Sequence, residues 1–241
     1  MATLRERLAD EVPLVAVSFG DDDAERDAAR VGDLRVDVAE LRVDWYSSVE
    51  PDHVLDRVRR FRGLPTLATI RSKAEGGSWP GGEAERLRLF EAVLPEVDAV
   101  DVELSSEEIL PGVVAAARRH DRLVVVSYHD FTGTPPAGRL TEIVEGAADA
   151  GADLVKISTM AHGPGDLLAL AELLTRHSSR RLIVIGMGAE GAASRVFFPL
   201  LGSRITYSAI GGRSAPGQLP FDETVRLLET FSPRFAERRR D

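Results

Sequence analysis

Short apolar runs recur along the chain at nearly even spacing, and they alternate with amphipathic segments. Most of the runs carry Val, Ile and Leu at both odd and even positions, which is typical of parallel strands covered on both faces. Eight runs are predicted as strands: Leu14–Phe19, Val38–Val43, Thr66–Arg71, Ala99–Leu104, Leu123–His129, Leu154–Thr159, Leu182–Gly186 and Ile205–Ile210.

The segments between these strands have the pattern of helices, because their apolar residues recur at intervals of three and four. The predicted helices are Asp22–Arg30, Asp52–Phe61, Glu83–Leu94, Glu107–Arg119, Leu140–Ala150, Asp166–His177 and Ala189–Leu201. Gly32, Gly63, Gly151 and Gly202 follow helical stretches, where a left-handed residue often ends a helix. Ser105-Ser-Glu-Glu108 has the spacing of a capping box for the helix after the fourth strand.

Eight strands that alternate with helices over 241 residues predict an α/β protein, a single-domain (β/α)8 TIM barrel spanning residues 1–241. A doubly wound open sheet is the alternative. That fold would place a glycine-rich phosphate-binding turn after the first strand. The chain has Ser18-Phe-Gly-Asp-Asp-Asp23 there, and these acidic residues favour the barrel.

Composition excludes several classes of function. The net charge of −9 argues against a general nucleic-acid binder. The absence of cysteine excludes disulfides, thiolate catalysis and cysteine-ligated metals. No apolar stretch reaches the roughly 18–20 residues of a membrane span, and the first residues lack the apolar region of a signal peptide. We therefore expect a cytoplasmic protein with a small-molecule substrate and neither a nucleic-acid nor a membrane partner.

Charged residues stand near the carboxyl ends of the predicted strands, which form the active-site face of such a barrel. Glu40, Arg42 and Asp44 alternate along the second strand and so share one face. An amphipathic edge strand would show the same pattern, but in a barrel this face points inward. Arg71 ends the third strand, and Glu75 begins a glycine-flanked loop. On the fourth strand, Asp101 and Glu103 share a face, and we expect internal salt bridges with the arginines rather than a metal site.

Lys156 is one of only two lysines among the 30 lysine and arginine residues, and it lies in the apolar run Asp153-Leu-Val-Lys-Ile-Ser-Thr159. One interpretation is an ion pair with Glu40 or Glu103. The other is a nucleophile, because a neutral amine attacks carbonyl carbon. At a pKa of about 10.4, roughly one lysine amine in 2,500 is neutral at pH 7. We expect nearby arginines and a dry interior to lower the pKa of Lys156.

His129 closes the fifth strand, and histidine is the side chain best suited to move protons near neutral pH. A buried structural histidine is the alternative, but the position at a strand end favours catalysis. After strands seven and eight come the glycine-containing segments Met187–Arg195 and Ile210–Pro220. Glycines there often hold phosphate. Arg195, Ser214 and Gln218 could equally hold a carboxylate and hydroxyl groups.

Seven of these segments, in order, resemble the type I 3-dehydroquinate dehydratases, the Schiff-base lyases of the shikimate pathway. The resemblance runs from about Val15 to Pro220. It rests on Glu40-Leu-Arg42, Arg71-x-x-x-Glu75-Gly-Gly, Ser127-Tyr-His-Asp-Phe131, Val155-Lys-Ile157, Met187-Gly, Arg195 and Ser214-Ala-Pro-Gly-Gln218. The fold of that family is a (β/α)8 barrel, the same fold that the strand pattern predicts.

The resemblance implies a role for each matched residue. Lys156 would form an imine with the C3 ketone of 3-dehydroquinate. His129 would remove a C2 proton and then protonate the departing C1 hydroxyl, and Glu75 would orient His129. Arg195 would pair with the substrate carboxylate, and Met187 would line the pocket. The ring hydroxyls and carboxylate would also contact Glu40, Arg42, Arg71, Ser214 and Gln218. No cofactor or metal is implied, and because members often dimerise we expect a homodimer.

Two features depart from the family pattern. Tyr207 stands where members often have phenylalanine, so the polarity of the pocket would differ slightly. The chain before the first strand is short, and the N-terminal hairpin that closes the barrel bottom in many members is expected to be reduced or absent. The rival interpretations are a class I aldolase that grips a sugar phosphate, and a non-catalytic barrel that binds a small carboxylate.

Overall fold

Eight strands, each parallel to its neighbours, form the centre of the computed structural model, which describes residues 3–22, 24–210 and 217–240. They are β1 (Leu14–Phe19), β2 (Val38–Arg42), β3 (Thr66–Thr69), β4 (Ala99–Glu103), β5 (Leu123–Asp130), β6 (Leu154–Met160), β7 (Leu182–Met187) and β8 (Ile205–Ser208). Neighbours follow the order β7-β6-β5-β4-β3-β2-β1-β8. The Arg204 N–H donates to the Leu182 carbonyl at 2.8 Å between β7 and β8. The (β/α)8 barrel is therefore confirmed.

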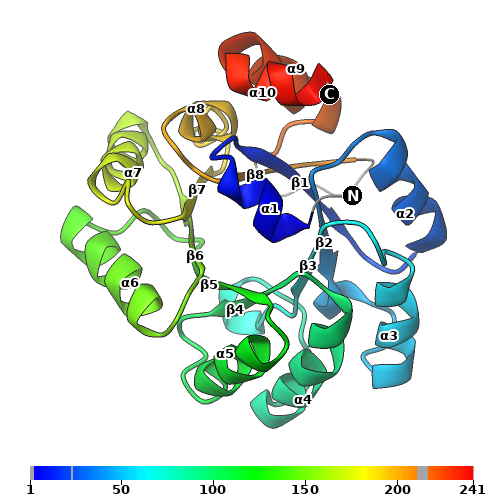
Figure 1. Ribbon diagram of the computed structural model, residues 1–241. Helices are drawn as coiled ribbons and strands as arrows, with labels where there is room; N and C mark the ends of the chain where they lie inside the picture. Colours follow the sequence, from blue (N-terminus) through cyan, green and yellow to red (C-terminus); the bar gives the residue numbers. More distant parts are fainter. Residues whose placement is uncertain (1–2, 23, 211–216, 241) are drawn as a thin grey trace.

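Helices surround this barrel (Figure 1). Those outside it are α2 (Ala24–Asp33), α3 (Pro51–Arg59), α4 (Glu83–Val93), α5 (Leu110–Arg119), α6 (Ala137–Asp149), α7 (Pro164–Arg176), α8 (Ser194–Leu200), α9 (Phe221–Phe231) and α10 (Pro233–Arg240). The described residues also contain three single turns of 3-10 helix: η1 (Val43–Trp45), η2 (Lys73–Glu75) and η3 (Leu94–Glu96). No helix in the described part of the chain combines the length and apolar character needed to cross a membrane.

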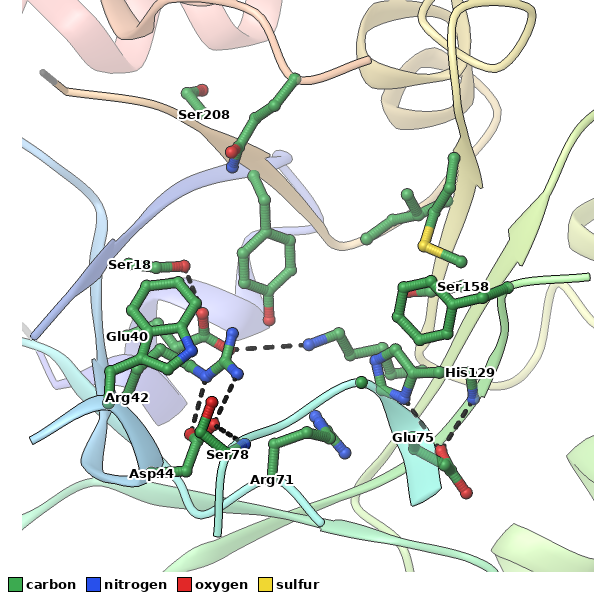
Figure 2. Close-up of a pocket in the computed structure, with 18 of the residues that line it drawn as sticks. Ser18, Glu40, Arg42, Asp44, Arg71, Glu75, Ser78, His129, Ser158 and Ser208 are labelled. Carbon is green, nitrogen blue, oxygen red and sulfur yellow. Dashed lines mark hydrogen bonds and ion pairs between the residues drawn. The ribbon is translucent and has the colours of Figure 1, made fainter. Parts of the chain in front are cut away.

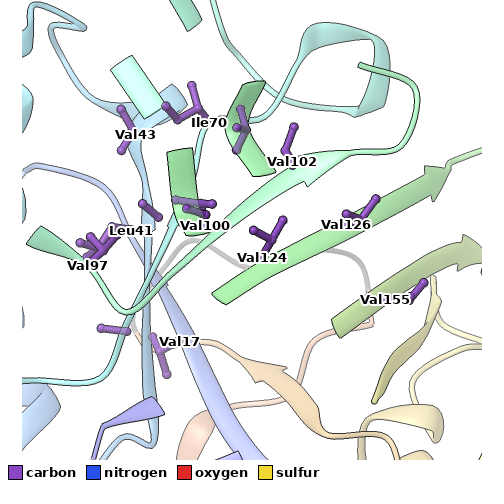
Figure 3. Close-up of a cluster of buried hydrophobic side chains, with 14 of the residues drawn as sticks. Val17, Leu41, Val43, Ile70, Val97, Val100, Val102, Val124, Val126 and Val155 are labelled. Carbon is purple, nitrogen blue, oxygen red and sulfur yellow. The ribbon is translucent and has the colours of Figure 1, made fainter. Parts of the chain in front are cut away.

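Alternation along the strands separates two apolar regions. Outward residues such as Leu41, Val100 and Val126 are buried against the helices (Figure 3). Inward residues near the amino ends of the strands are also apolar, and Leu14 and Val38 are fully buried in the barrel interior. Toward the carboxyl ends the inward positions become polar. The barrel therefore has an apolar end and a polar end.

A short N-terminal helix, α1 (Leu4–Ala9), lies across the apolar end of the barrel (Figure 1). Leu4 and Leu8 are each 1% exposed and belong to the interior cluster. Asp37 anchors this end, because its carboxylate accepts from Arg7 of α1 at 3.2 Å and from Arg238 of α10 at 2.9 Å. Residues 3–13 thus contain a short helix that plugs this end of the barrel.

Two local predictions about helix ends are wrong. Helix α5 begins at Leu110 without a side-chain cap, because Ser105 instead donates to Glu75. Helix α2 continues through Gly32 to Asp33, and Arg35 takes the positive φ of 55°. The other three glycines do have positive φ, as predicted. The predicted capping box at Ser105 fails because of a contact between loops, which the local spacing of residues does not reveal.

Candidate active site

A cavity of about 840 Å³ opens at the polar end of the barrel. Nine of the ten predicted site residues line it, while Ser214 lies outside the described residues. The nine are Glu40, Arg42, Arg71, Glu75, His129, Lys156, Met187, Arg195 and Gln218. Figure 2 shows several of them converging from different strands. The structure therefore brings the predicted set together, and the role of each residue stays a prediction.

Strand register explains why Lys156 and His129 meet. Lys156 of β6 lies beside Ser127 of β5, and His129 follows Ser127 by two residues. Side chains two residues apart point to the same face of a strand. The amine and the imidazole therefore point into the barrel from adjacent strands. His129 lies two residues closer to the carboxyl end than the residue that pairs with Lys156.

The Lys156 amine is buried among acidic groups. Its Nζ donates to Asp101 Oδ2 at 3.0 Å and lies 3.6 Å from Glu40 Oε1. It also lies 4.4 Å from the centre of the Tyr207 ring. Of the two ion-pair partners considered from the sequence, the structure shows Glu40. Asp101 takes the place of Glu103.

The expected lowering of the Lys156 pKa is wrong for the protein without substrate. Burial by itself lowers the pKa of Lys156, but the Asp101 carboxylate, with Tyr207 and Glu40, raises it above the ordinary value. The positive charge of Arg71 opposes this rise in the pKa of Lys156 only in part. Its guanidinium is already paired with Asp101 at 2.8 Å and with Glu103 at 3.1 Å. Lys156 is therefore an ammonium group in the resting protein.

The carboxylates of β4 form the internal salt bridges that the sequence predicted. Asp101 and Glu103 both pair with Arg71. Glu103 also pairs with Arg86, a fully buried residue of α4 that donates to the Ile70 carbonyl at 2.7 Å. The sequence carried no signal for Arg86, because an arginine on an amphipathic helix is usually exposed.

Glu75 holds His129 in place. Its Oε2 lies 3.0 Å from His129 Nδ1 and accepts the His129 backbone N–H at 2.9 Å (Figure 2). Burial, together with the positive charges of Arg71 and Lys156, lowers the pKa of His129 well below its ordinary value. If Glu75 accepts the Nδ1 proton, Nε2 carries the free lone pair. His129 is thus a neutral imidazole suited to accept a proton.

Arg195, at the start of α8, is 3% exposed. Within the described part of the chain its Nε has no hydrogen-bond partner, and no carboxylate contributes to its pKa. Burial lowers the pKa of Arg195 to about 10. A buried cation without a counter-ion is costly. The arrangement therefore favours an anionic ligand at this wall of the cavity.

Arg42 differs from Arg195, because it already has a counter-ion within the protein. Its guanidinium donates to both Asp44 oxygens at 2.9 and 2.8 Å and lies 3.9 Å from the centre of the Trp45 ring. Two serines that the sequence did not single out also support the site: Ser18 donates to Glu40, and Ser105 donates to Glu75. Ser18 shares the inward face of β1 with Leu14 and Ala16, so strand alternation could have identified it. Ser105 gave no such signal.

Comparison with known proteins identifies the family. The family model described as type I 3-dehydroquinase matches residues 6–233. The chain is 36% identical over 215 residues to a 3-dehydroquinate dehydratase of Methanosarcina barkeri, which covers 85% of this chain and 88% of that protein. The crystal structure of 3-dehydroquinate dehydratase from Geobacillus kaustophilus superposes with a TM-score of 0.86 and 32% identity, over 92% of this chain and 91% of that one.

A second solved structure, of the type I enzyme from Clostridium difficile with covalent modified comenic acid, has a TM-score of 0.86 and 28% identity. It covers 92% of this chain and 93% of that one. The family model extends over nearly all of the chain. The chain belongs to the type I 3-dehydroquinase family.

Proposed function

We propose that the chain dehydrates 3-dehydroquinate to 3-dehydroshikimate through an imine between Lys156 and the C3 ketone of the substrate. Family membership supports dehydration within the shikimate pathway. The observation that carries the mechanism is the pairing of a buried amine with a neutral imidazole in one cavity. The covalent modified ligand in the Clostridium difficile relative is consistent with covalent chemistry in this family.

Arg195 sets the orientation of the substrate. A guanidinium matches a carboxylate with two parallel hydrogen bonds. The Arg195 side chain lacks a counter-ion within the described residues, so the C1 carboxylate of 3-dehydroquinate supplies one. The ring then extends from Arg195 toward Lys156, with its C3 ketone at the amine.

Imine formation conserves charge. The Lys156 ammonium and the ketone together give a protonated imine and one molecule of water, so no proton enters or leaves overall. The amine must be neutral only while it attacks C3. His129 is neutral because its pKa is lowered, so its lone pair is free to accept the ammonium proton for that interval, at a cost in free energy, and to return it to the departing oxygen.

Proton removal follows. A protonated imine withdraws electrons from the adjacent C2–H bond, and the electron pair of that bond is stored as an enamine. His129 Nε2 takes the C2 proton, and Glu75 stabilises the resulting imidazolium through Nδ1. The enamine then expels the C1 hydroxyl, which leaves as water with the proton from His129. Hydrolysis of the imine releases 3-dehydroshikimate and restores Lys156.

The ion pair between Lys156 and Asp101 also suits a non-catalytic barrel that binds a carboxylate. Such a barrel would have no use for an imidazole that is kept neutral and oriented by Glu75. A class I aldolase would require a phosphate site beyond β7 and β8. Arg195 serves a carboxylate equally well, and the family match favours the dehydratase.

The test of this function is the absorbance of the conjugated enone formed from 3-dehydroquinate by the purified protein. We expect turnover that a chelator leaves unchanged, and its loss in His129→Ala. An unchanged protein that forms no enone, or a His129→Ala variant with an ordinary rate, would contradict the proposal.

We also propose a homodimer. Exposed apolar side chains gather on two neighbouring helices, with Leu168 of α7 66% exposed and Phe197 of α8 52% exposed. Light scattering during size-exclusion chromatography tests this, and a monomeric mass at micromolar concentration would contradict it.

A further inference from the structure

Tyr207 carries an unused hydroxyl in the catalytic cavity. The side chain is 5% exposed and lines the cavity from β8. Its hydroxyl has no hydrogen-bond partner among the described residues. A buried hydroxyl without a partner costs about 1–3 kcal/mol.

The Tyr207 ring and hydroxyl both lie near the reacting nitrogen. Lys156 Nζ lies 4.4 Å from the centre of the ring. The amine also lowers the pKa of the phenol as a hydrogen-bond donor to its oxygen, although their geometry falls outside that of an ordinary hydrogen bond. Burial, with the nearby carboxylates of Glu40 and Asp101, raises the pKa of Tyr207 against the opposing charge of Lys156. The phenol therefore keeps its proton at any working pH, and it can donate a hydrogen bond but cannot act as a base.

Two arginines that line the same cavity already have counter-ions within the protein. Arg71 pairs with Asp101 and Glu103, and Arg42 is held by both oxygens of Asp44. A ketone that approaches Lys156 Nζ places its oxygen close to the same nitrogen. Among these side chains, Tyr207 has a hydroxyl proton that no described residue accepts.

We propose that Tyr207 is a further catalytic residue whose hydroxyl donates a hydrogen bond to the C3 ketone oxygen during attack by Lys156. This inference rests on the proposed imine mechanism. The bond between nitrogen and C3 forms while the C=O π electrons move to oxygen, so negative charge develops there. A donor already in place stabilises that charge more than the neutral ketone, which lowers the barrier. The oxygen then takes two protons from the former ammonium group and leaves as water, and Tyr207 keeps its own proton.

The test compares the unchanged protein with Tyr207→Phe in rapid-quench experiments with 3-dehydroquinate and borohydride. Reduction converts the imine to a stable adduct, so its rate of appearance reports imine formation. Loss of one donor to a developing oxyanion typically slows a reaction by about 10²–10³-fold. We expect the adduct to form about 10²-fold more slowly in Tyr207→Phe. Quinate has a hydroxyl in place of the ketone, so its dissociation constant should change little.

A kinetic isotope effect separates this role from a structural one. If imine formation becomes slow, removal of the C2 proton no longer limits turnover. The isotope effect on kcat for substrate deuterated at C2 should then fall toward one in Tyr207→Phe. If Tyr207 had only a structural role, Tyr207→Phe would weaken quinate binding and keep the isotope effect of the unchanged protein. That result would overturn the proposal.

Tyr128→Phe is the control. Tyr128 does not line the cavity, and its hydroxyl donates to Asp130 at 3.2 Å. Its adduct should form at close to the unchanged rate. If Tyr207→Phe forms the adduct as fast as Tyr128→Phe, the role of Tyr207 is wrong while the imine mechanism stands. If the unchanged protein forms no adduct, the imine mechanism itself fails.

Discussion

At the scale of single residues, the site depends on where one proton rests. The pKa of Lys156 is raised mainly by Asp101, while the pKa of His129 is lowered by burial and by neighbouring cations. The proton therefore lies on the amine in the resting protein. Attack on a ketone requires the opposite arrangement, an amine without that proton and an imidazole with it. Both arrangements hold the same number of protons, so the exchange needs no proton from solution.

Because both arrangements hold the same number of protons, we predict that kcat/KM is independent of pH over a wide range. His129 gains a proton only well below its ordinary value of 6.5, because its pKa is lowered. Lys156 loses its proton only above 10.5, because its pKa is raised. Between these limits His129 and Lys156 each keep one protonation state, and kcat/KM reports groups of the free enzyme. We expect kcat/KM to be constant from about pH 7 to about pH 9 and to decline on the acidic side below 6.5.

Steady-state rates in buffers of constant ionic strength check the profile. A tenfold rise in kcat/KM for each pH unit through neutrality would mean that Lys156 must first lose its proton to solvent. An acidic limb centred at or above pH 6.5 would mean that His129 is not held neutral as the structure indicates.

At the scale of elements, a short turn positions the carboxylate that orients His129. Glu75 ends η2, and Gly76 follows with φ of 78°. The chain then passes so close to the segment after β3 that a Cβ on Gly77 would lie 2.1 Å from the Arg71 carbonyl oxygen. Glycine at position 77 therefore allows the turn to pack directly on the backbone of Arg71.

Gly77→Ala tests this packing. The added methyl group must push the turn away from the backbone of Arg71, which should cost roughly 1–3 kcal/mol of stability. Since Glu75 moves with the turn, kcat should fall in the folded variant. Gly138→Ala is the control, because no atom lies within 4 Å of the added group in α6. Urea unfolding and kcat together measure both effects, and a Gly77→Ala protein with unchanged stability would contradict the account.

The strands and their inward residues could be predicted from sequence, because alternation is a local property. Glu40, Arg71 and His129 each lie on the inward face that their strand pattern indicated. Ser105 and Arg86 could not be predicted in this way. Their partners, Glu75 and Glu103, lie 30 and 17 residues away in other elements. Spacing along one element carries no information about such contacts.

At the scale of the whole molecule, stability and chemistry lie at opposite ends of one barrel. The cavity opens at the carboxyl ends of the strands, while α1 closes the amino ends with Leu4 and Leu8. The sequence did not reveal this plug, since a helix of six residues is too short for a periodic pattern to be recognised. The raised pKa of Lys156 was missed for a related reason, because it depends on Asp101 from another strand.

Leu8→Ala tests this separation. Removing a fully buried leucine leaves a cavity in the core, and such changes typically cost about 2–5 kcal/mol. Unfolding in urea should show a loss of that size, while kcat of the folded protein should stay near its original value. Leu168→Ala, at a residue 66% exposed, should cost much less. A large loss of kcat in folded Leu8→Ala would show that the two ends are coupled.

The most direct measurement of the central claim is reduction by borohydride in the presence of 3-dehydroquinate, followed by peptide mass spectrometry. We predict a stable adduct on Lys156, which is absent without substrate and absent in Lys156→Met. Lys73, the other lysine, lies in η2 and should remain unmodified in the same digest. Turnover of the substrate with no adduct on Lys156, or an adduct found only on Lys73, would contradict the mechanism.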